Sequence, residues 1–375
     1  MLLSVVVSTW RRPKELKLVL AGLVAQSLAF KDFEVIVVDS NSGDETPDVV
    51  REFEAVQGFN VRLEQAELNS ASAKRNKGVR LAKGRYVVLL DDDCVPDPAH
   101  LSNFLNAANS RRGERVIWCG GVRFSCSLVS TSNYYRYRDS CHFSADKPLP
   151  NSLGYKTIVT MNMLAERDIL LQDNALFDER FVGYGFEDTE FGLRVGKLGY
   201  SVLPCRAEIE HVEPEGSISK FCRKYYHAAR DGMPEFMKVA TTDDLETLGP
   251  IRWMEPGFAL SSKFQSLFRA VLCLALESKF SNILIHSLEK TDSIRWLYSR
   301  AAYRLVLASS YRKGFSIESR NFPKRKQTKM GGTREAEKRC SGSPFCVSLS
   351  YSPKSIRCVL FSSCWVLWAV FSLIY

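Results

Sequence analysis

Three consecutive aspartates, Asp91, Asp92 and Asp93, follow directly on the apolar run at residues 85–90. Adjacent carboxylates repel one another, so the end of a buried strand seldom tolerates three of them without a cation to neutralise the charge. Oxygen ligands of this kind suit hard divalent cations such as Mg²⁺ or Mn²⁺. The cluster therefore predicts a metal site in which Asp93 binds the ion and Asp91 contacts a ribose or metal-bound water. A solvated acidic turn is the alternative.

Two other segments place polar side chains where apolar runs end. Thr9 and Arg11 follow the first run, at residues 2–8, and Asp39 and Asn41 follow the second. In a parallel sheet the carboxyl ends of the strands meet at one edge, where ligands bind. Asp39 could accept hydrogen bonds from a base or a ribose at that edge. A helix cap by Thr9 and an ordinary polar turn around Asn41 are the structural alternatives.

Cations and a second pair of acids lie on predicted helices. Lys74, Arg75 and Lys77 occupy the first half of one helix, where they could approach phosphates or form a solvated basic face. Glu187 and Asp188 open a later helix after a glycine-containing loop. This pair could supply a general base beside an acceptor hydroxyl. It could also be two acids that the helix dipole stabilises.

Histidine and cysteine give weaker signals. His211 ends a short predicted strand and could be a third protein ligand for the metal, or an ordinary structural histidine. The chain has 11 cysteines but no Cys-x-x-Cys pair, which favours reduced, buried cysteines in a cytosolic protein. We expect no secretory signal peptide, because Arg11 and Arg12 interrupt the first apolar run.

The elements that must position these residues alternate between strand and helix. Strands are predicted at residues 2–8, 33–38, 61–64 and 86–90, and helices at 14–26, 44–53 and 70–82. This rhythm predicts βαβ units and a mostly parallel sheet with helices on both faces. Later elements are a helix at 100–109, strands at 115–124, 157–164, 200–203 and 207–212, and a helix at 187–198. Residues 125–153 are expected to form an irregular binding or lid loop.

The C-terminal third has a different character. Helices are predicted at residues 262–277 and 292–309. Residues 316–375 contain ten Lys and Arg against three Glu, so most of the formal net charge of +9 belongs to the tail. A nearly neutral main body argues against nucleic-acid binding. Residues 359–375 carry no charge and could span a membrane, lie at its surface, or pack as an ordinary helix.

Taken together, these segments resemble the GT-A glycosyltransferases, specifically the large inverting family 2. The resemblance covers residues 3–215, and the order and spacing of six motifs carry it. They are S-T-x-R-R-P, V-V-D-S-N-S-x-D, A-x-x-R-N-x-G, L-L-D-D-D, F-D-E-R-F-x-G-Y-G-x-E-D-x-E and a final histidine. The fifth contains a galactosyltransferase-like Gly-x-Gly-x-Glu-Asp sequence. The resemblance implies an α/β GT-A fold, Rossmann-like, with a mostly parallel central sheet flanked by helices and a C-terminal helical extension.

The resemblance also implies a division of the chain. Residues 1–110 would form the nucleotide-sugar-binding half of the GT-A domain and residues 111–216 its acceptor-binding half. Residues 217–315 would form the helical extension. Residues 316–355 would be a basic, disordered linker, and residues 356–375 an apolar tail that is a candidate membrane anchor.

The roles of single residues follow from the same resemblance. Asp188 would be the catalytic base and Glu187 an acceptor contact. Asp93, Asp91 and His211 would bind Mn²⁺ or Mg²⁺. The donor nucleotide would contact Thr9, Arg11, Asp39, Asn41, Arg75, Asp91 and Asp92.

The implied activity is metal-dependent, inverting transfer of a sugar from a nucleoside-diphosphate sugar, by family habit a UDP-sugar. The implied acceptor is a hydroxyl of a glycan or lipid-linked molecule. The expected location is cytoplasmic, peripheral or tail-anchored at the cytoplasmic face of a membrane. Three alternatives remain: a non-catalytic nucleotide-sugar-binding protein on the same fold, a nucleotidyltransferase, and a membrane or partner-binding protein defined by its tail. The second is disfavoured because the first loop has no glycine.

Overall fold

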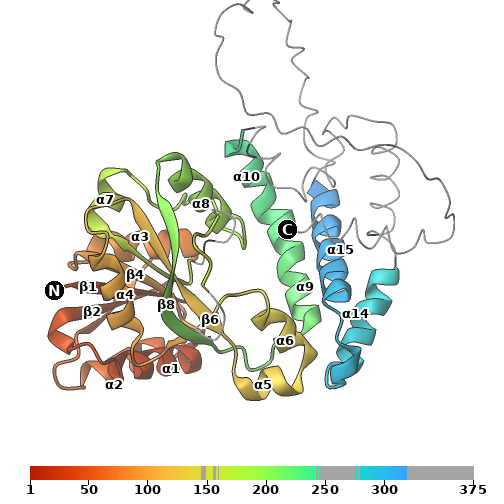
Figure 1. Ribbon diagram of the computed structural model, residues 1–375, viewed down its shortest axis with the longest axis horizontal. Helices are drawn as coiled ribbons and strands as arrows, with labels where there is room; N and C mark the ends of the chain where they lie inside the picture. The colour runs from red at the N-terminus through yellow and green to blue at the C-terminus, as the bar shows by residue number, and fades with distance from the viewer. Residues whose placement is uncertain are drawn as a thin grey trace, which may run out of the picture.

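The computed structural model describes residues 1–144, 149–154, 158, 160–241, 244, 276 and 279–318. Within these residues the chain forms a body built on an eight-stranded sheet and a group of helices packed beside it (Figure 1). The strand order is β3-β2-β1-β4-β7-β6-β8-β5. The α/β architecture with C-terminal helices is therefore the one that the sequence predicts.

The first half of the sheet is parallel. Its strands are β1 (Leu3–Thr9), β2 (Phe33–Asp39), β3 (Val61–Gln65) and β4 (Tyr86–Asp91). The connecting helices are α1 (Pro13–Val24), η1 (Phe30–Asp32), α2 (Thr46–Glu54) and α3 (Ala71–Leu81). The register pairs Ser8 with Asp91 and Thr9 with Asp39, so the carboxyl ends of β1, β2 and β4 meet at one edge. The four predicted strands and three predicted helices of this region are confirmed.

The second half of the sheet is mixed. Its strands are β5 (Cys94–Pro96), β6 (Val116–Arg123), β7 (Asn162–Glu166) and β8 (Ser201–His211). β7 runs antiparallel to β4 and β6, and β5 runs antiparallel to β8, whereas β6 and β8 are parallel. The two short strands predicted at residues 200–203 and 207–212 are one strand, which is a correction. The register of the two strands shifts between Gly120 and Val122, where β8 advances from Cys205 to Ile209, so the extra residues of this irregularity lie in β8.

Helices cover both faces of the sheet because side chains alternate along each strand. On β1, Val5 and Val7 pack with α1, α2 and α4 (His100–Asn109) on one face. Val6 faces the opposite side, where α3, α7 (Arg167–Gln172) and α8 (Glu187–Lys197) lie. The predicted helices at residues 100–109 and 187–198 are confirmed. The strand expected at residues 157–164 begins only at Asn162.

Residues 125–153 are not the irregular loop that the sequence predicts. They contain α5 (Cys126–Thr131) and α6 (Asn133–Asp139). Ser132 caps the start of α6, where its side chain accepts a hydrogen bond from Tyr135 N. Tyr134 and Tyr137 are buried against the C-terminal helices. Aromatic residues that look like binding-loop residues in the sequence are therefore core residues. Residues 145–148 of this segment lie outside the described residues.

The C-terminal helices form a separate layer beside the body, with α9 between the body and α14 and α15 (Figure 1). They are α9 (Ile218–His227), the π-helical turn η3 (Ala228–Gly232), α10 (Met233–Val239), α14 (Phe280–Lys290), η4 (Arg295–Leu297) and α15 (Arg300–Glu318). The helix predicted at residues 292–309 begins only at Arg300, because Asp292 instead accepts hydrogen bonds from the start of α6.

Three predictions concern residues that the structure does not describe. They are the helix at residues 262–277 except Leu276, almost all of the linker at 316–355, and the apolar tail at 356–375. Among the described helices, none combines the length and apolar character that crossing a membrane requires.

Candidate active site

The acid cluster lies where β4 ends, beside the end of β1. Thr9 Oγ1 donates a hydrogen bond of 2.8 Å to Asp92 Oδ2, and Trp10 N donates to the same oxygen at 3.4 Å. Asp92 and Asp93 are both buried, at 5% and 9% exposure. The first turn and the acid cluster are therefore one structural unit, as their strand-end positions predict.

Arg12 neutralises part of this charge, and the sequence did not single it out. Its Nη1 donates to Asp92 Oδ1 at 3.1 Å and also contacts Asp93 Oδ2. Burial and the negative charge of Asp93 raise the pKa of Asp92 to about 7. Burial also opposes ionisation of Asp93, but His211 and Arg12 outweigh it and hold the pKa of Asp93 below its usual value. Of the two acids, Asp93 is thus the stable carboxylate.

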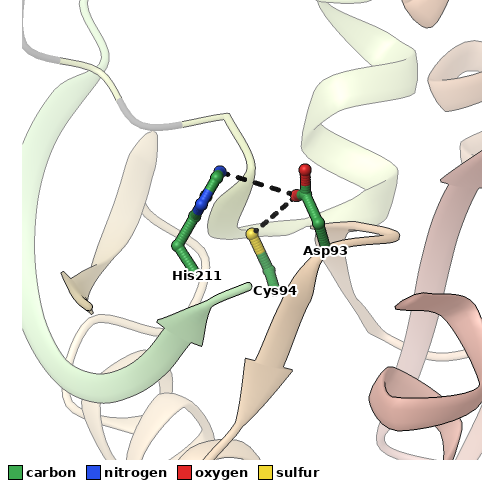
Figure 2. A group of neighbouring side chains, drawn as sticks. All are labelled: Asp93, Cys94 and His211. Atoms are coloured by element: carbon green, nitrogen blue, oxygen red, sulfur yellow. Dashed lines mark hydrogen bonds and ion pairs between the residues drawn. The ribbon is translucent and has the colours of Figure 1, made fainter. Parts of the chain in front are cut away.

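The metal-ligating atoms of Asp93, Cys94 and His211 all lie within 4.8 Å of one another. Figure 2 shows the His211 ring and the Cys94 thiol both directed at the Asp93 carboxylate. The His211 Nε2 to Asp93 Oδ1 distance is 3.7 Å, and the Cys94 Sγ to Asp93 Oδ1 distance is 3.6 Å. Pairing of β5 with β8 produces the arrangement, since it sets Cys94 directly opposite His211.

This group has the chemistry of a divalent cation site. His211 Nδ1 is buried without a hydrogen-bond partner among the described residues. Burial lowers the pKa of His211, which favours the neutral ring that binds metals. A carboxylate oxygen and an imidazole nitrogen suit Mn²⁺, and the thiol adds a softer donor that the sequence did not indicate. Asp91, the other predicted ligand, is not part of this group.

Asp91 is instead joined to the acid pair on α8. Arg75, at 5% exposure, donates from Nη2 to Asp91 Oδ1 at 3.0 Å and from Nη1 to Asp188 Oδ1 at 3.2 Å. Glu187 Oε1 lies 3.9 Å from the same Nη1. Residues from β4, α3 and α8 therefore meet around one guanidinium.

The acid pair occupies the first turn of α8, and unusual backbone geometry sets its position. Gly185 has φ of +95° and Phe186, which caps the helix, has φ of +71°. Burial and the neighbouring Asp188 raise the pKa of Glu187 to about 7. Loss of hydration also raises the pKa of Asp188, although Arg75 and Thr160 oppose this; Thr160 Oγ1 donates to Asp188 at 2.5 Å.

The predicted donor residues at the ends of β1 and β2 lie in two turns that are hydrogen-bonded to each other. Asp39 accepts hydrogen bonds from Ser42 N at 2.9 Å and from Ser42 Oγ. Arg11 N donates to Ser42 Oγ at 2.8 Å, which joins the two strand ends. Asn41, with φ of +52°, is exposed and donates from its backbone to Gln65. Ser42 is thus a connecting residue that the sequence did not single out.

The basic residues of α3 have different partners. Lys74 Nζ is buried and donates to Thr9 O at 3.0 Å and Asn69 Oδ1 at 3.2 Å. Lys77 donates to Gln65 O. Of the three predicted cations, Arg75 is therefore the one whose guanidinium enters the acid cluster.

Comparison with known proteins gives the family of the first part of the chain. Residues 4–165 match the family model described as Glycosyl transferase family 2. Chondroitin synthase of Escherichia coli is 28% identical over 253 residues, which are 57% of this chain and 35% of that protein. Validoxylamine A glucosyltransferase of Streptomyces hygroscopicus subsp. jinggangensis (strain 5008) is 35% identical over 271 residues, 64% of each chain. This chain thus spans only about a third of the first relative and less than two thirds of the second.

Among solved structures, the mannosyltransferase PcManGT from Pyrobaculum calidifontis, in complex with GDP-Man and Mn²⁺, is similar in fold. The TM-score is 0.50 at 17% identity, over 84% of this chain and 86% of that one. Residues 4–165 thus belong to glycosyl transferase family 2, and the α/β body has the GT-A fold.

Proposed function

We propose that the chain is a metal-dependent, inverting glycosyltransferase. It moves a sugar from a nucleoside-diphosphate sugar to a hydroxyl group of a glycan or lipid-linked acceptor. One observation carries the proposal: Arg75 joins Asp91, at the end of β4, to Asp188, at the start of α8. A donor held at the strand ends would therefore lie beside a carboxylate that can accept the acceptor's proton.

In the proposed reaction the acceptor hydroxyl attacks the anomeric carbon and gives its proton to the Asp188 carboxylate. The bond from that carbon to the donor phosphate breaks as the new bond forms, and the nucleoside diphosphate leaves with the electron pair. A single displacement of this kind inverts the anomeric configuration. A raised pKa suits Asp188 as a base, because a catalytic base works best when its pKa approaches the working pH.

Asp93 and His211 would hold Mn²⁺ or Mg²⁺, and Asp91 would contact the ribose of the donor or a metal-bound water. The ion would stabilise the negative charge that develops on the departing diphosphate. Arg75 keeps Asp188 oriented, and Glu187 would contact the acceptor. The nucleoside would lie against the ends of β1, β2 and β4 and the three segments that follow them, which contain Thr9, Arg11, Asp39, Asn41 and Asp92.

The names of the two relatives support sugar transfer, since one is a chondroitin synthase and the other a glucosyltransferase. The sugar and the base of the donor are best found by a screen of UDP-, GDP- and dTDP-sugars with Mn²⁺, starting with UDP-sugars. Release of a nucleoside diphosphate that requires both metal and Asp188 supports the proposal. Release of pyrophosphate would indicate a nucleotidyltransferase, and tight binding without any release would indicate a binding protein.

A further inference from the structure

A cavity of about 300 Å³ lies between the loop that precedes α8 and the helix α9. Its lining residues are Tyr184, Lys220, Arg223, Lys224, His227 and Asp231. Three of the six side chains are cationic at neutral pH and one more can become so, against a single acid. None of these residues was predicted as a site residue from the sequence.

The basic residues form one row on α9. Their spacing, at positions i, i+3, i+4 and i+7, places all four on the same face of the helix. At 1.5 Å of rise per residue the row is roughly 10 Å long. A row of this length can contact several anionic groups that are spaced along a chain, whereas a single phosphate would occupy only part of it.

Carboxylates balance this row only in part. Lys220 lies 3.0 Å from Glu215, Lys224 lies 3.6 Å from Glu213, and His227 lies 3.7 Å from Asp231. Arg223 is exposed and has no carboxylate partner in the described part of the chain. A planar, exposed guanidinium can bind a carboxylate or phosphate through two parallel hydrogen bonds.

The cavity adjoins the candidate catalytic residues. Tyr184 precedes Glu187 by three residues, and its loop packs directly on the continuation of α9. A Cβ atom on Gly185 would lie 2.5 Å from Ala228 Cβ, and one on Gly183 would lie 2.9 Å from Asp231 Cβ. At the other side, Lys224 lies close enough to Asp93 and Arg12 to interact with both electrostatically. A molecule in this cavity would thus reach the position where Asp188 meets the acceptor.

We propose that the α9 row binds acidic groups of the acceptor, which is a linear, acidic carbohydrate chain. This inference rests on the proposed glycosyltransferase function and adds the class of acceptor to it. The donor's diphosphate is the other anion in the reaction, but its predicted ligands lie at the ends of β1, β2 and β4. The acidic groups of the acceptor could be carboxylates or phosphates, since the row suits both.

The test is equilibrium binding to the full chain, measured by fluorescence anisotropy with labelled probes. The acidic probes are a polyuronate hexasaccharide and a linear oligosaccharide that carries phosphate groups, and the neutral probe is the carboxyl-reduced form of the same hexasaccharide. The test variant is Lys220→Ala/Arg223→Ala, which leaves Lys224 beside Asp93 untouched. The control, Lys31→Ala, removes an exposed cation from η1, at the opposite edge of the sheet. Binding of UDP with Mn²⁺ is measured in parallel.

We expect at least one acidic probe to bind to the wild-type protein. Its affinity for the double variant should be lower by about tenfold or more, because charge-assisted hydrogen bonds are lost. The control variant should bind the acidic probe as the wild-type protein does, which ties the loss to this row. The neutral probe should bind more weakly than the acidic probe, which ties binding to charge. Equal losses in the double variant and in Lys31→Ala, equal binding of the neutral probe, or no binding of either acidic probe would each overturn the inference. A parallel loss of UDP affinity in the double variant would assign the row to the donor and also overturn it. Failure of wild-type protein to bind any nucleotide would instead count against the proposed function.

Discussion

A substitution of Asp188 distinguishes a role in sugar transfer from a role in donor binding. Asp188→Asn keeps the size of the side chain and can still accept a hydrogen bond, but it cannot take a proton from the acceptor. We expect donor binding within about twofold of wild type and transfer reduced by about 10²–10⁴-fold, the usual contribution of a general base. Calorimetry with the donor and Mn²⁺, together with product formation, measures the two quantities.

Asp93→Ala is the matched comparison, because it removes a carboxylate from the other end of the site. It should abolish the dependence of donor binding on Mn²⁺, since Asp93 is the ionised acid that His211 and Cys94 face. Metal-dependent binding is measured by titrating Mn²⁺ at fixed donor concentration. If the two variants lose donor binding to the same extent, separate roles for Asp93 and Asp188 are untenable.

Glu187 links the site to the pH dependence of stability. Its pKa in the folded protein is about 7, above the ordinary 4.5, so the folded state prefers the protonated form. Its buried charge therefore destabilises the fold progressively as pH rises from about 4.5 to 7, and fully above 7. Glu187→Gln should raise the free energy of unfolding at pH 8 by about 1–3 kcal/mol and change it little at pH 5. Denaturant unfolding at both pH values measures this.

The control for that comparison is Glu54→Gln, which changes an exposed acid at the end of α2. It should leave the unfolding free energy within about 0.5 kcal/mol of wild type at both pH values. Equal effects of Glu187→Gln at pH 5 and pH 8 would show that the charge of Glu187 is not the cause.

At the residue scale the sequence indicates positions better than partners. Asp91 and Arg75 could be placed near the sheet edge from strand ends and helix spacing alone. The sequence could not show which of Arg11 and Arg12 faces the acids. The positive φ of Arg11 decides this, because it turns the backbone so that Arg12 reaches Asp92 and Asp93. Cys94 was missed for a similar reason, since only the pairing of β5 with β8 brings it to His211.

At the element scale, periodic apolar runs predict the first four strands and their helices well. Prediction fails where an element depends on distant partners. α5 and α6 are short and carry polar residues, so their helical state depends on tertiary packing. Leu128 and Val129 of α5 and Tyr134 and Tyr137 of α6 pack in one cluster with helices more than 80 residues later. Elements of this kind carry little local signal, since tertiary contacts stabilise them more than propensity does.

The loop before α8 gives a prediction that belongs to an element. Gly185→Ala adds a Cβ atom 2.5 Å from Ala228 Cβ at a φ of +95°, so the loop must move away from the continuation of α9. We expect a loss of about 1–3 kcal/mol in unfolding free energy and reduced transfer, because Glu187 and Asp188 follow directly. Thermal unfolding and initial rates measure the two effects.

Gly196→Ala is the matched control for Gly185→Ala. Gly196 lies inside α8, and a Cβ atom there would meet nothing within 4 Å. It should stabilise the helix by about 0.5–1 kcal/mol and leave transfer unchanged. If both alanine variants behave alike, contact between the loop and α9 is not what positions the acid pair.

At the scale of the whole molecule, the C-terminal helices are part of the fold that supports the site. α9 packs between the body and α15 (Figure 1). Tyr303, Val306 and Leu307 of α15 are buried in one cluster with Ile218 and Cys222 of α9. Phe315 is buried in a second cluster with residues of η3 and α10. The proposed acceptor row on α9 therefore depends on α15 for its position.

Two truncations test this dependence and the expectation that the tail is a membrane anchor. A chain ending at Glu318 keeps α15 and should retain folding and transfer. Its binding to vesicles with acidic lipids should fall, because the basic segment and the uncharged residues 359–375 are lost. A chain ending at Ser299 loses five buried apolar side chains of the described residues, of which the four larger than alanine are each worth about 1.5–3 kcal/mol, and should not fold stably. Cosedimentation and thermal unfolding measure these outcomes.

A full-length Val366→Arg/Leu367→Arg variant separates the two parts of the tail. It keeps the basic segment and interrupts only the uncharged run, where two charges oppose insertion into a bilayer. If the uncharged run is the anchor, this variant should leave the membrane as completely as the chain ending at Glu318. If the basic segment suffices, it should stay bound at low salt and dissociate as ionic strength rises, because electrostatic attraction to acidic lipids is screened. If the chain ending at Glu318 binds vesicles as strongly as the full chain does, the membrane contact lies on the folded body instead of the tail.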